Sequence, residues 1–348
     1  MAGLVVPEVS KGRLPLRHSC RRAWGARPDA RAPFVNGGEM RYIIRRMKPV
    51  FPEFRPITLE DRDIIHPRLW EYQPETSELN FTNLFIWRAH YGFLWSTYRD
   101  WLLVIGGNSG NGVQALPPIG PASRAEVTAM LLQWLKEERN IPEPHIDRVD
   151  RRLAAELEGK PAFVCEPVRD HFDYVYRTAD LVELAGKNYR QKRNHINYLL
   201  RTHKMVYEPM RESHVDSCLS LSRNWCEARQ CEEDLSLGSE GEATREALLN
   251  FRTLGLDGGV ILVNGRVEAF TLGELLNRDT AVVHTEKANV EIRGLYALIN
   301  QQFCENRWRD VPSVNREQDL GEPGLRKAKL SYNPDHMAEK FRLRLREL

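Results

Sequence analysis

Residues 259–285 read GVILVNGRVEAFTLGELLNRDTAVVHT and carry the clearest fold signal in the chain. Asn264-Gly265 is the strongest short signal for a hairpin turn, because both residue types accept the positive φ angles that a tight turn requires. Apolar residues flank this turn on both sides, so the sequence predicts a hairpin of strands 259–263 and 266–274. A further strand is expected over 280–285, which makes this region part of a sheet.

The order of elements around this hairpin occurs twice along the chain. A strand followed by a helix is expected near Ile57 and again near Tyr207, roughly 150 residues later. Strands and helices mixed in this order predict an α+β or α/β chain of two units. We expect one unit over residues 48–185 and the other over 206–348, each with a mixed central sheet flanked by helices.

Three local patterns make expectations that the structure can test. Ser123–Glu126 has the spacing of a capping box and predicts the start of a helix. The apolar segments 163–168 and 174–177 are expected to pair with each other as strands. Cys218 and Cys226 fall on the apolar stripe of a predicted helix, so both are expected in the core.

The composition is that of a globular protein. The chain has 348 residues, of which 42% are hydrophobic and 28% charged, and this excludes a wholly disordered or fibrous chain. Its apolar runs are strand-sized, well short of the roughly 20 residues that a membrane helix needs. Six cysteines occur without a CxxC pair, so neither a disulfide framework nor a metal site is indicated, and a cytoplasmic location is expected.

The basic charge is concentrated at the N-terminus. Residues 1–46 contain ten Lys and Arg against three acidic residues, which leaves 40 basic and 45 acidic residues for the rest. The folded part is therefore not expected to be a globally basic nucleic-acid binder. Residues 1–47 are predicted to be a disordered tail or a targeting arm. Alternatively, residues 1–39 are not translated, because Gly-Gly-Glu before Met40 fits a translated ribosome-binding site, and Met40 or Met47 is the start.

A basic segment follows the first unit. Residues 186–207 read GKNYRQKRNHINYLLRTHKMVY, with six Lys and Arg and no acidic residue. This pattern predicts a bridging helix over 186–205 with an apolar face and a basic stripe. The stripe is expected either to contact phosphates of RNA or lipid headgroups, or to be a solvated face. Lys192 falls on the apolar side, so it either extends to solvent or points into a cleft. The candidate phosphate-binding residues are Lys187, Arg190, Lys192, Arg193, Arg201 and Lys204.

Residues 279–296 (DTAVVHTEKANVEIRGLY) place polar groups at a strand–helix junction. His284 and Glu286 alternate along the strand and are expected to share a face, where a histidine can act as a general base near neutral pH. Lys287 is the residue directly after Glu286. Arg293-Gly294 opens the next helix, and a helix N-terminus after a strand is a ready anion site.

Residues 315–334 (NREQDLGEPGLRKAKLSYNP) form a second polar cluster. Acidic and amide side chains follow a short strand, and cations occur in the first turns of the next helix, where they oppose the helix dipole. Such a local conflict is typical of a functional site, and a structural ion-pair network is the alternative. The polar residues of this segment that we single out are Asn315, Arg316, Glu317, Asp319, Arg326 and Lys329.

Five segments together resemble a bacterial family related to the C-terminal domain of phosphatidylglycerol lysyltransferase. They are SELNFTNLFIW (77–87), GKNYRQKRNHIN (186–197), DGGVILVNGRVEAFTLGE (257–274), DTAVVHTEKA (279–288) and NREQDLGEPGLRKAKLSY (315–332). The resemblance covers about residues 48–348. It implies two tandem GNAT-like domains of the acyl-CoA N-acyltransferase type, with the active site in the second.

The resemblance also implies a reaction. The related lipid aminoacylases and Fem-type peptidyltransferases take an amino acid from aminoacyl-tRNA and pass it to a lipid hydroxyl or a peptide amine. Aminoacyl-tRNA is then the expected co-substrate, with no permanently bound cofactor, and a lipid headgroup, peptide or small molecule is the acceptor. Peripheral contact with an anionic membrane at the inner face fits the same expectation. The GNAT pyrophosphate loop is reduced here to Arg293-Gly294, and Tyr296 stands where a small residue is usual.

On this basis the expected catalytic residues are His284, Glu286, Asn315, Glu317 and Asp319, with His284 or Glu286 as the proton acceptor. The expected donor-binding residues are Lys287, Arg293, Gly294, Arg316, Arg326 and Lys329. Two alternatives stay open. One is an acyl-CoA-dependent N-acyltransferase, which needs the Arg293-Gly294 loop to accept pyrophosphate. The other is a non-catalytic module that binds RNA or a membrane surface, which makes no demand on His284 or Glu286.

Overall fold

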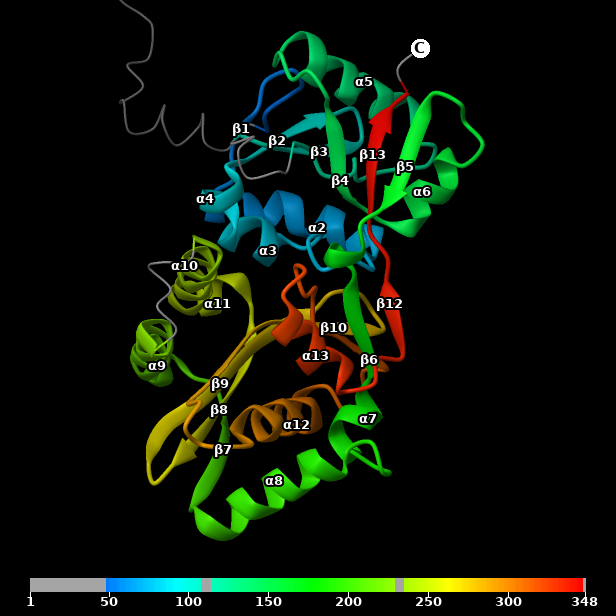
Figure 1. The fold of residues 1–348 in the computed structure, drawn as a ribbon. Helices are drawn as coiled ribbons and strands as arrows, with labels where there is room; N and C mark the ends of the chain where they lie inside the picture. The colour runs from blue at the N-terminus through cyan, green and yellow to red at the C-terminus, as the bar shows by residue number, and fades with distance from the viewer. Residues whose placement is uncertain (1–47, 108–113, 229–234, 347–348) are drawn as a thin grey trace, which may run out of the picture. The chain divides into compact units, whose positions relative to one another are not determined.

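The fold is described from a computed structural model, which describes residues 48–107, 114–228 and 235–346 (Figure 1). These described residues belong to one compact unit. The predicted basic tail lies outside the described residues. Among the described helices, none combines the length and the apolar character that crossing a membrane requires.

Strands and helices are mixed throughout this unit. The strands are β1 Arg55–Pro56, β2 Phe93–Tyr98, β3 Trp101–Gly106, β4 His145–Val149, β5 Phe163–Pro167, β6 Asp173–Arg177, β7 Met205–Pro209, β8 Asp257–Val263, β9 Arg266–Leu275, β10 Thr280–Ala288, β11 Ser313–Asn315, β12 His336–Ala338 and β13 Phe341–Leu345. The α-helices are α2 Arg62–Tyr72, α3 Phe81–Ile86, α4 Arg88–Tyr91, α5 Ala125–Glu137, α6 Arg151–Leu157, α7 Thr178–Glu183, α8 Arg190–Thr202, α9 Val215–Ala228, α10 Leu235–Leu249, α11 Phe251–Leu254, α12 Leu295–Arg307 and α13 Pro323–Leu330. Short 3-10 turns include η1 Leu59–Asp61 and η4 Glu212–His214.

A seven-stranded mixed sheet in the order β12-β6-β11-β10-β9-β8-β7 is the centre of the C-terminal part. The predicted hairpin is confirmed as β8 and β9, and its turn residues Asn264 and Gly265 have φ angles of 52° and 82°. Strand β10 pairs antiparallel with β9 and parallel with β11. Helix α12 lies against β8, β9 and β10, while α9 contacts β9 and β10 (Figure 1). The expected mixed α+β architecture is therefore confirmed.

Two strands are exchanged between the parts of the chain. Strand β6 lies between β12 and β11 in the large sheet, and β13 lies between β4 and β5 in a separate three-stranded sheet. The expectation that 163–168 pairs with 174–177 is therefore wrong, because β5 pairs with β13 and β6 pairs with β11 and β12. The division into units 48–185 and 206–348 stays a prediction. Strand β6 from the first range is part of the large sheet, and strand β13 from the second range is part of the three-stranded sheet.

Local packing confirms some expectations and corrects others. Every residue of α3 is buried. The helix after Ser123 is confirmed as α5, but its N-cap is Arg124, whose backbone N–H donates to Glu156 Oε2 at 3.0 Å, so the capping box is not formed. Cys218 is buried as expected. Cys226 is only partly buried and is disulfide-bonded, which corrects the expectation of a core thiol.

Candidate functional site

A β-bulge decides which way the polar residues of β10 point. The pairing of β10 with β9 shifts register between Val283 and Thr285. Gly273 lies opposite this point, and a Cβ atom there would be 2.4 Å from the carbonyl oxygen of Val282. The extra residue reverses the alternation of the strand. The expected shared face of His284 and Glu286 is therefore wrong, and their side chains enter two different networks.

The first network surrounds His284, whose side chain is completely buried. Its Nδ1 lies 3.0 Å from Glu317 Oε1, and its Nε2 lies 3.1 Å from Glu274 Oε1. Asn83 Nδ2 of α3 donates to the same Glu317 oxygen at 3.0 Å. Burial disfavours the charged imidazolium, but the hydrogen bonds to the two carboxylates outweigh it and raise the pKa of His284 to about 9. At neutral pH both ring nitrogens are therefore occupied donors.

The second network joins Glu286 to the segment after β11. Arg316 Nη2 lies 3.0 Å from Glu286 Oε1, and Asn300 Nδ2 of α12 donates to Glu286 Oε2 at 3.2 Å. The Arg316 guanidinium also lies 4.7 Å from the ring centre of Tyr332. Its Nη1 is buried and makes no hydrogen bond within the described residues. An unpaired buried N–H group is costly, so an oxygen of a ligand or of a water molecule placed at Arg316 Nη1 would be stabilising.

Lys329 holds the loop that carries Arg316 and Glu317. Its Nζ, from α13, donates to the carbonyl oxygens of both residues, and the contact to Glu317 is 3.1 Å long. Burial, together with the nearby Arg316 charge, lowers the pKa of Lys329 to about 8. Glu317 and Leu320 have φ angles of 57° and 51°, in the left-handed region that non-glycine residues rarely adopt. Backbone strain of this kind concentrates at functional sites.

Asn315 and Asp319 lie in structural networks beside this loop. Asn315 Nδ2 donates to Asp173 Oδ2 at 3.0 Å, and the fully buried Lys340 lies 2.6 Å from Asp173 Oδ1. Asp319 accepts from Arg326 Nε at 2.8 Å and from the Tyr174 hydroxyl. Although burial opposes it, these hydrogen bonds hold the pKa of Asp319 well below its usual range. Neither carboxylate network touches His284 or Glu286 directly.

Lys287 points away from Glu286. Its Nζ lies 2.8 Å from Glu240 Oε1 of α10 and 3.4 Å from the ring centre of Trp225 of α9. The structure thus brings together His284 with Glu317, and Glu286 with Arg316, while Lys287 lies on the α9–α10 side of the sheet.

The N-terminus of α12, the predicted anion site, is covered by α8. Gly294 caps α12 with a φ angle of 95°, and a Cβ atom there would be 2.8 Å from the Cβ of His195. Arg293 is exposed. A pyrophosphate bound at this helix start in the usual way would meet the side of α8.

Helix α8 shows which basic residues are free to meet a partner. Lys192 donates to Ser331 Oγ at 2.7 Å and lies 4.0 Å from the ring centre of Tyr332, so it points towards the end of α13. Arg193 donates to the carbonyl oxygens of Leu184 and Gly186 and closes the preceding loop. The remaining candidates, which are exposed, are Lys187, Arg190, Arg201 and Lys204.

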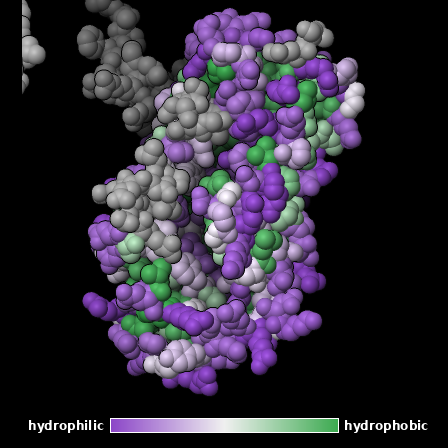
Figure 2. Space-filling view, viewed as in Figure 1, coloured by the Kyte–Doolittle hydropathy of each residue, from purple (hydrophilic) through white to green (hydrophobic). Residues whose placement is uncertain are grey.

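Two cavities lie away from these networks. One of about 370 Å³ lies between β7, β8, α11 and the end of α12, and one of about 460 Å³ lies between α6, β5 and β13. Neither is lined by any residue of the predicted site. The surface in Figure 2 is hollowed next to α13, the helix from which Lys329 reaches the loop at Glu317.

Comparison with known proteins identifies relatives of this chain. A conserved protein of unknown function from Bacteroides thetaiotaomicron is 35% identical, with a TM-score of 0.78, and the match covers 84% of this chain and 99% of that one. The C-terminal domain of a putative lysylphosphatidylglycerol synthetase from Agrobacterium fabrum shares the fold at 11% identity, with a TM-score of 0.57 and coverage of 83% and 92%. An uncharacterised protein of Mycoplasmoides gallisepticum is 20% identical over 212 residues, 56% of this chain and 67% of that protein.

The family assignment rests on a match over most of the chain. Residues 71–344 match the family described as phosphatidylglycerol lysyltransferase, C-terminal. This range includes both networks, the basic helix, strand β6 and all of strand β13 except Leu345. Its fold is shared with the C-terminal domain of the Agrobacterium fabrum protein. The chain therefore belongs to the phosphatidylglycerol lysyltransferase C-terminal family.

Proposed function

We propose that this protein transfers an amino acid from aminoacyl-tRNA to a lipid headgroup, a peptide or a small molecule. The observation that carries the proposal is the packing of α8 over the start of α12. His195 occupies the space beside Gly294 where acyl-CoA would need backbone N–H groups. The same helix exposes Arg190 and Arg201, which suit the phosphates of an acceptor stem.

The chemistry needs three contributions from the protein. An aminoacyl ester is already activated, so the site must orient the acceptor, take up its proton and stabilise the oxyanion of the tetrahedral intermediate. A buried site with fixed charges supplies these without reorganising water. The two networks around His284 and Glu286 offer one group for proton uptake and one for stabilising the oxyanion.

Glu317 is our candidate for the proton acceptor. Its Oε1 is fixed by His284 and Asn83, its Oε2 makes no hydrogen bond within the described residues, and its side chain is 17% exposed. His284 is less suited to this role, because its pKa of about 9 keeps the ring protonated at neutral pH. Instead the imidazolium bridges the Glu317 and Glu274 carboxylates, one at each ring nitrogen.

Arg316 is our candidate for oxyanion stabilisation. Glu286 and Tyr332 fix its guanidinium, and its free Nη1 is the donor that a carbonyl oxygen becoming negative would require. Lys329 positions both Arg316 and Glu317 through their carbonyl oxygens. Asn315 and Asp319, with Arg326, would act only by holding the loop that carries these groups.

A single-turnover assay with charged tRNA tests this assignment. Glu317→Gln should lower the rate of transfer about 10²–10⁴-fold, and Arg316→Lys about 10²–10³-fold, with tRNA binding unchanged. The matched control is Glu305→Gln on the exposed side of α12, which should transfer at the normal rate. An unchanged rate of transfer in both the Glu317→Gln and Arg316→Lys variants would overturn the proposed site.

Donor choice is tested by ligand stabilisation. Millimolar acetyl-CoA should leave the melting temperature unchanged, since a ligand present at 100 times its Kd would stabilise the fold by about 2.7 kcal/mol and be easily visible. A clear shift with acetyl-CoA, together with acyl transfer from it, would assign the protein to the acyl-CoA class. Binding of tRNA without any transfer would favour the non-catalytic alternative.

A further inference from the structure

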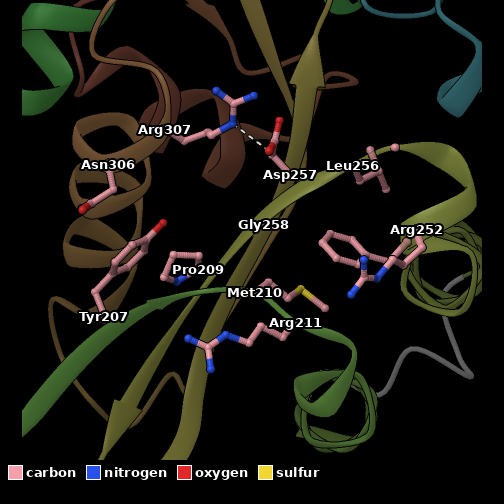
Figure 3. Close-up of a pocket in the computed structure, with 12 residues that line it drawn as sticks. Tyr207, Pro209, Met210, Arg211, Arg252, Leu256, Asp257, Gly258, Asn306 and Arg307 are labelled. Carbon is pink, nitrogen blue, oxygen red and sulfur yellow. Dashed lines mark ion pairs between the residues drawn. The ribbon is translucent and has the colours of Figure 1, made fainter.

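The cavity at the edge of the large sheet has features of a ligand site distinct from the two networks. Its volume of about 370 Å³ falls in the range of small-molecule sites. The ends of β7 and β8 form its floor, and α11 and the last turn of α12 form its walls (Figure 3). No residue of the aminoacyl-transfer proposal lines it.

Three arginines from three separate segments line this cavity. Arg211 follows β7, Arg252 lies on α11, and Arg307 ends α12. Arg307 Nε lies 2.7 Å from Asp257 Oδ1, shown by the dashed line in Figure 3, and Arg252 Nε lies 2.9 Å from Glu212 Oε1. The Arg211 guanidinium has no ion-pair partner among the described residues. The three arginines therefore carry one positive charge more than the two carboxylates that pair with Arg307 and Arg252 can neutralise.

The existing ion pairs leave these arginines able to bind an anion. Both partners of the Arg252–Glu212 pair are largely exposed, and exposed pairs of this kind contribute little to stability. In both pairs the nitrogen closest to the carboxylate is Nε, so the terminal Nη groups can donate elsewhere. Arginine side chains offer paired donors that match the oxygens of a phosphate.

The floor and inner wall of this cavity are apolar, and the backbone segments that form them pack closely. A Cβ atom on Gly258 would lie 2.8 Å from the Cβ of Met210, so β8 can approach β7 only with glycine at this position. Met210, Phe251 and Leu256 are buried and line the cavity. Tyr207 adds a hydroxyl, and burial raises its pKa to about 12, so the phenol stays a neutral donor.

We propose that this cavity binds a small phosphate ester, with the phosphate on its arginine-lined rim and an apolar or aromatic body against Met210 and Phe251. An apolar wall beside a cationic rim suits a ligand that has both parts. This inference does not depend on the aminoacyl-transfer proposal, because it concerns other residues and is tested by binding alone.

Calorimetric titration of the full chain with phenyl phosphate tests the proposal. We expect saturable binding at one site, weaker binding of inorganic phosphate because it lacks the apolar body, and much weaker binding of benzoate because it lacks the phosphate. The variant Arg211→Gln/Arg252→Gln should lower the affinity for phenyl phosphate at least about tenfold. Both side chains are exposed, so the fold should survive, and an unchanged melting temperature would confirm this.

The matched control is Arg309→Gln. Arg309 lies two residues beyond Arg307, is exposed and pairs with Glu305, but does not line the cavity. This variant should bind phenyl phosphate as the unchanged protein does. No binding at millimolar phenyl phosphate, or equal affinity in the Arg211→Gln/Arg252→Gln variant, would overturn the site. Equal affinity for benzoate would overturn the phosphate class, and equal affinity for inorganic phosphate would overturn the role of the apolar wall.

Discussion

Replacing His284 with glutamine should make the stability of the protein respond differently to pH. His284 has a pKa of about 9 in the folded protein, against 6.5 for an unperturbed histidine. Because the folded pKa is the higher one, protonation of His284 stabilises the fold. This contribution is fully present below about pH 6.5 and is lost as the pH rises through about 9.

The size of the effect follows from the same two values. The difference between a pKa of about 9 and one of 6.5 corresponds to about 3 kcal/mol of folding free energy. His284 is completely buried, so solvent does not screen its contacts with Glu274 and Glu317. Glutamine cannot be protonated in this range and should lack the whole pH-dependent contribution.

Urea unfolding of both proteins between pH 6 and pH 9.5 measures this contribution. Taking the difference at each pH cancels other groups that titrate there, including Lys329, whose pKa is about 8. The difference in unfolding free energy should shrink by about 3 kcal/mol across the range. The control is His336→Gln, which replaces an exposed histidine and leaves the His284 network intact. A flat difference for His284→Gln, or an NMR titration midpoint for His284 below pH 7, would refute the reasoning.

Three further predictions concern other parts of the molecule. Lys340→Met should destabilise the protein by about 3–5 kcal/mol in urea unfolding, because it leaves the charge of the buried Asp173 without the cation that neutralises it; a loss below 1 kcal/mol would contradict this. Gly265→Ala should cost about 1 kcal/mol, since φ is 82° in the hairpin turn, and an unchanged melting temperature would show that the turn relaxes. Charge reversal at Arg190 and Arg201 should weaken tRNA binding and lower the salt slope by about 0.7–0.9 per lost phosphate contact, and an unchanged slope would mark α8 as a solvated face.

The sequence predicted those elements whose signal is local. The Asn264-Gly265 turn needs only its own two residues and the apolar strands beside it, and the hairpin formed as expected. Helix α5 was predicted from the capping-box spacing of Ser123–Glu126, and the helix formed although the cap at Ser123 did not. Here the N-cap is Arg124, and its backbone N–H is bound by Glu156, a residue distant in sequence that no local pattern indicates.

The arrangement of the site was harder to predict because it depends on pairing between strands. Simple alternation placed His284 and Glu286 on one face, and one bulge opposite Gly273 reversed it. Glu274 and Asn83, the other members of the His284 network, were not singled out. A signal for Glu274 was available, since it is the one charged residue in the second half of β9, which reads AFTLGEL over 269–275. Asn83 comes from the other end of the chain, and no local pattern points to it.

The exchanged strand β13 also governs how the chain can fold during synthesis. β13 follows every other described strand in chain order, yet it fills the middle of a sheet between β4 and β5. Until it arrives, these two strands have no partner between them, and Ile146 lacks the apolar cover of the cluster that includes Leu343. Domains generally fold as units while the ribosome is still adding residues. The three-stranded sheet of β4, β13 and β5 can therefore form only after residues 341–345 have left the ribosome.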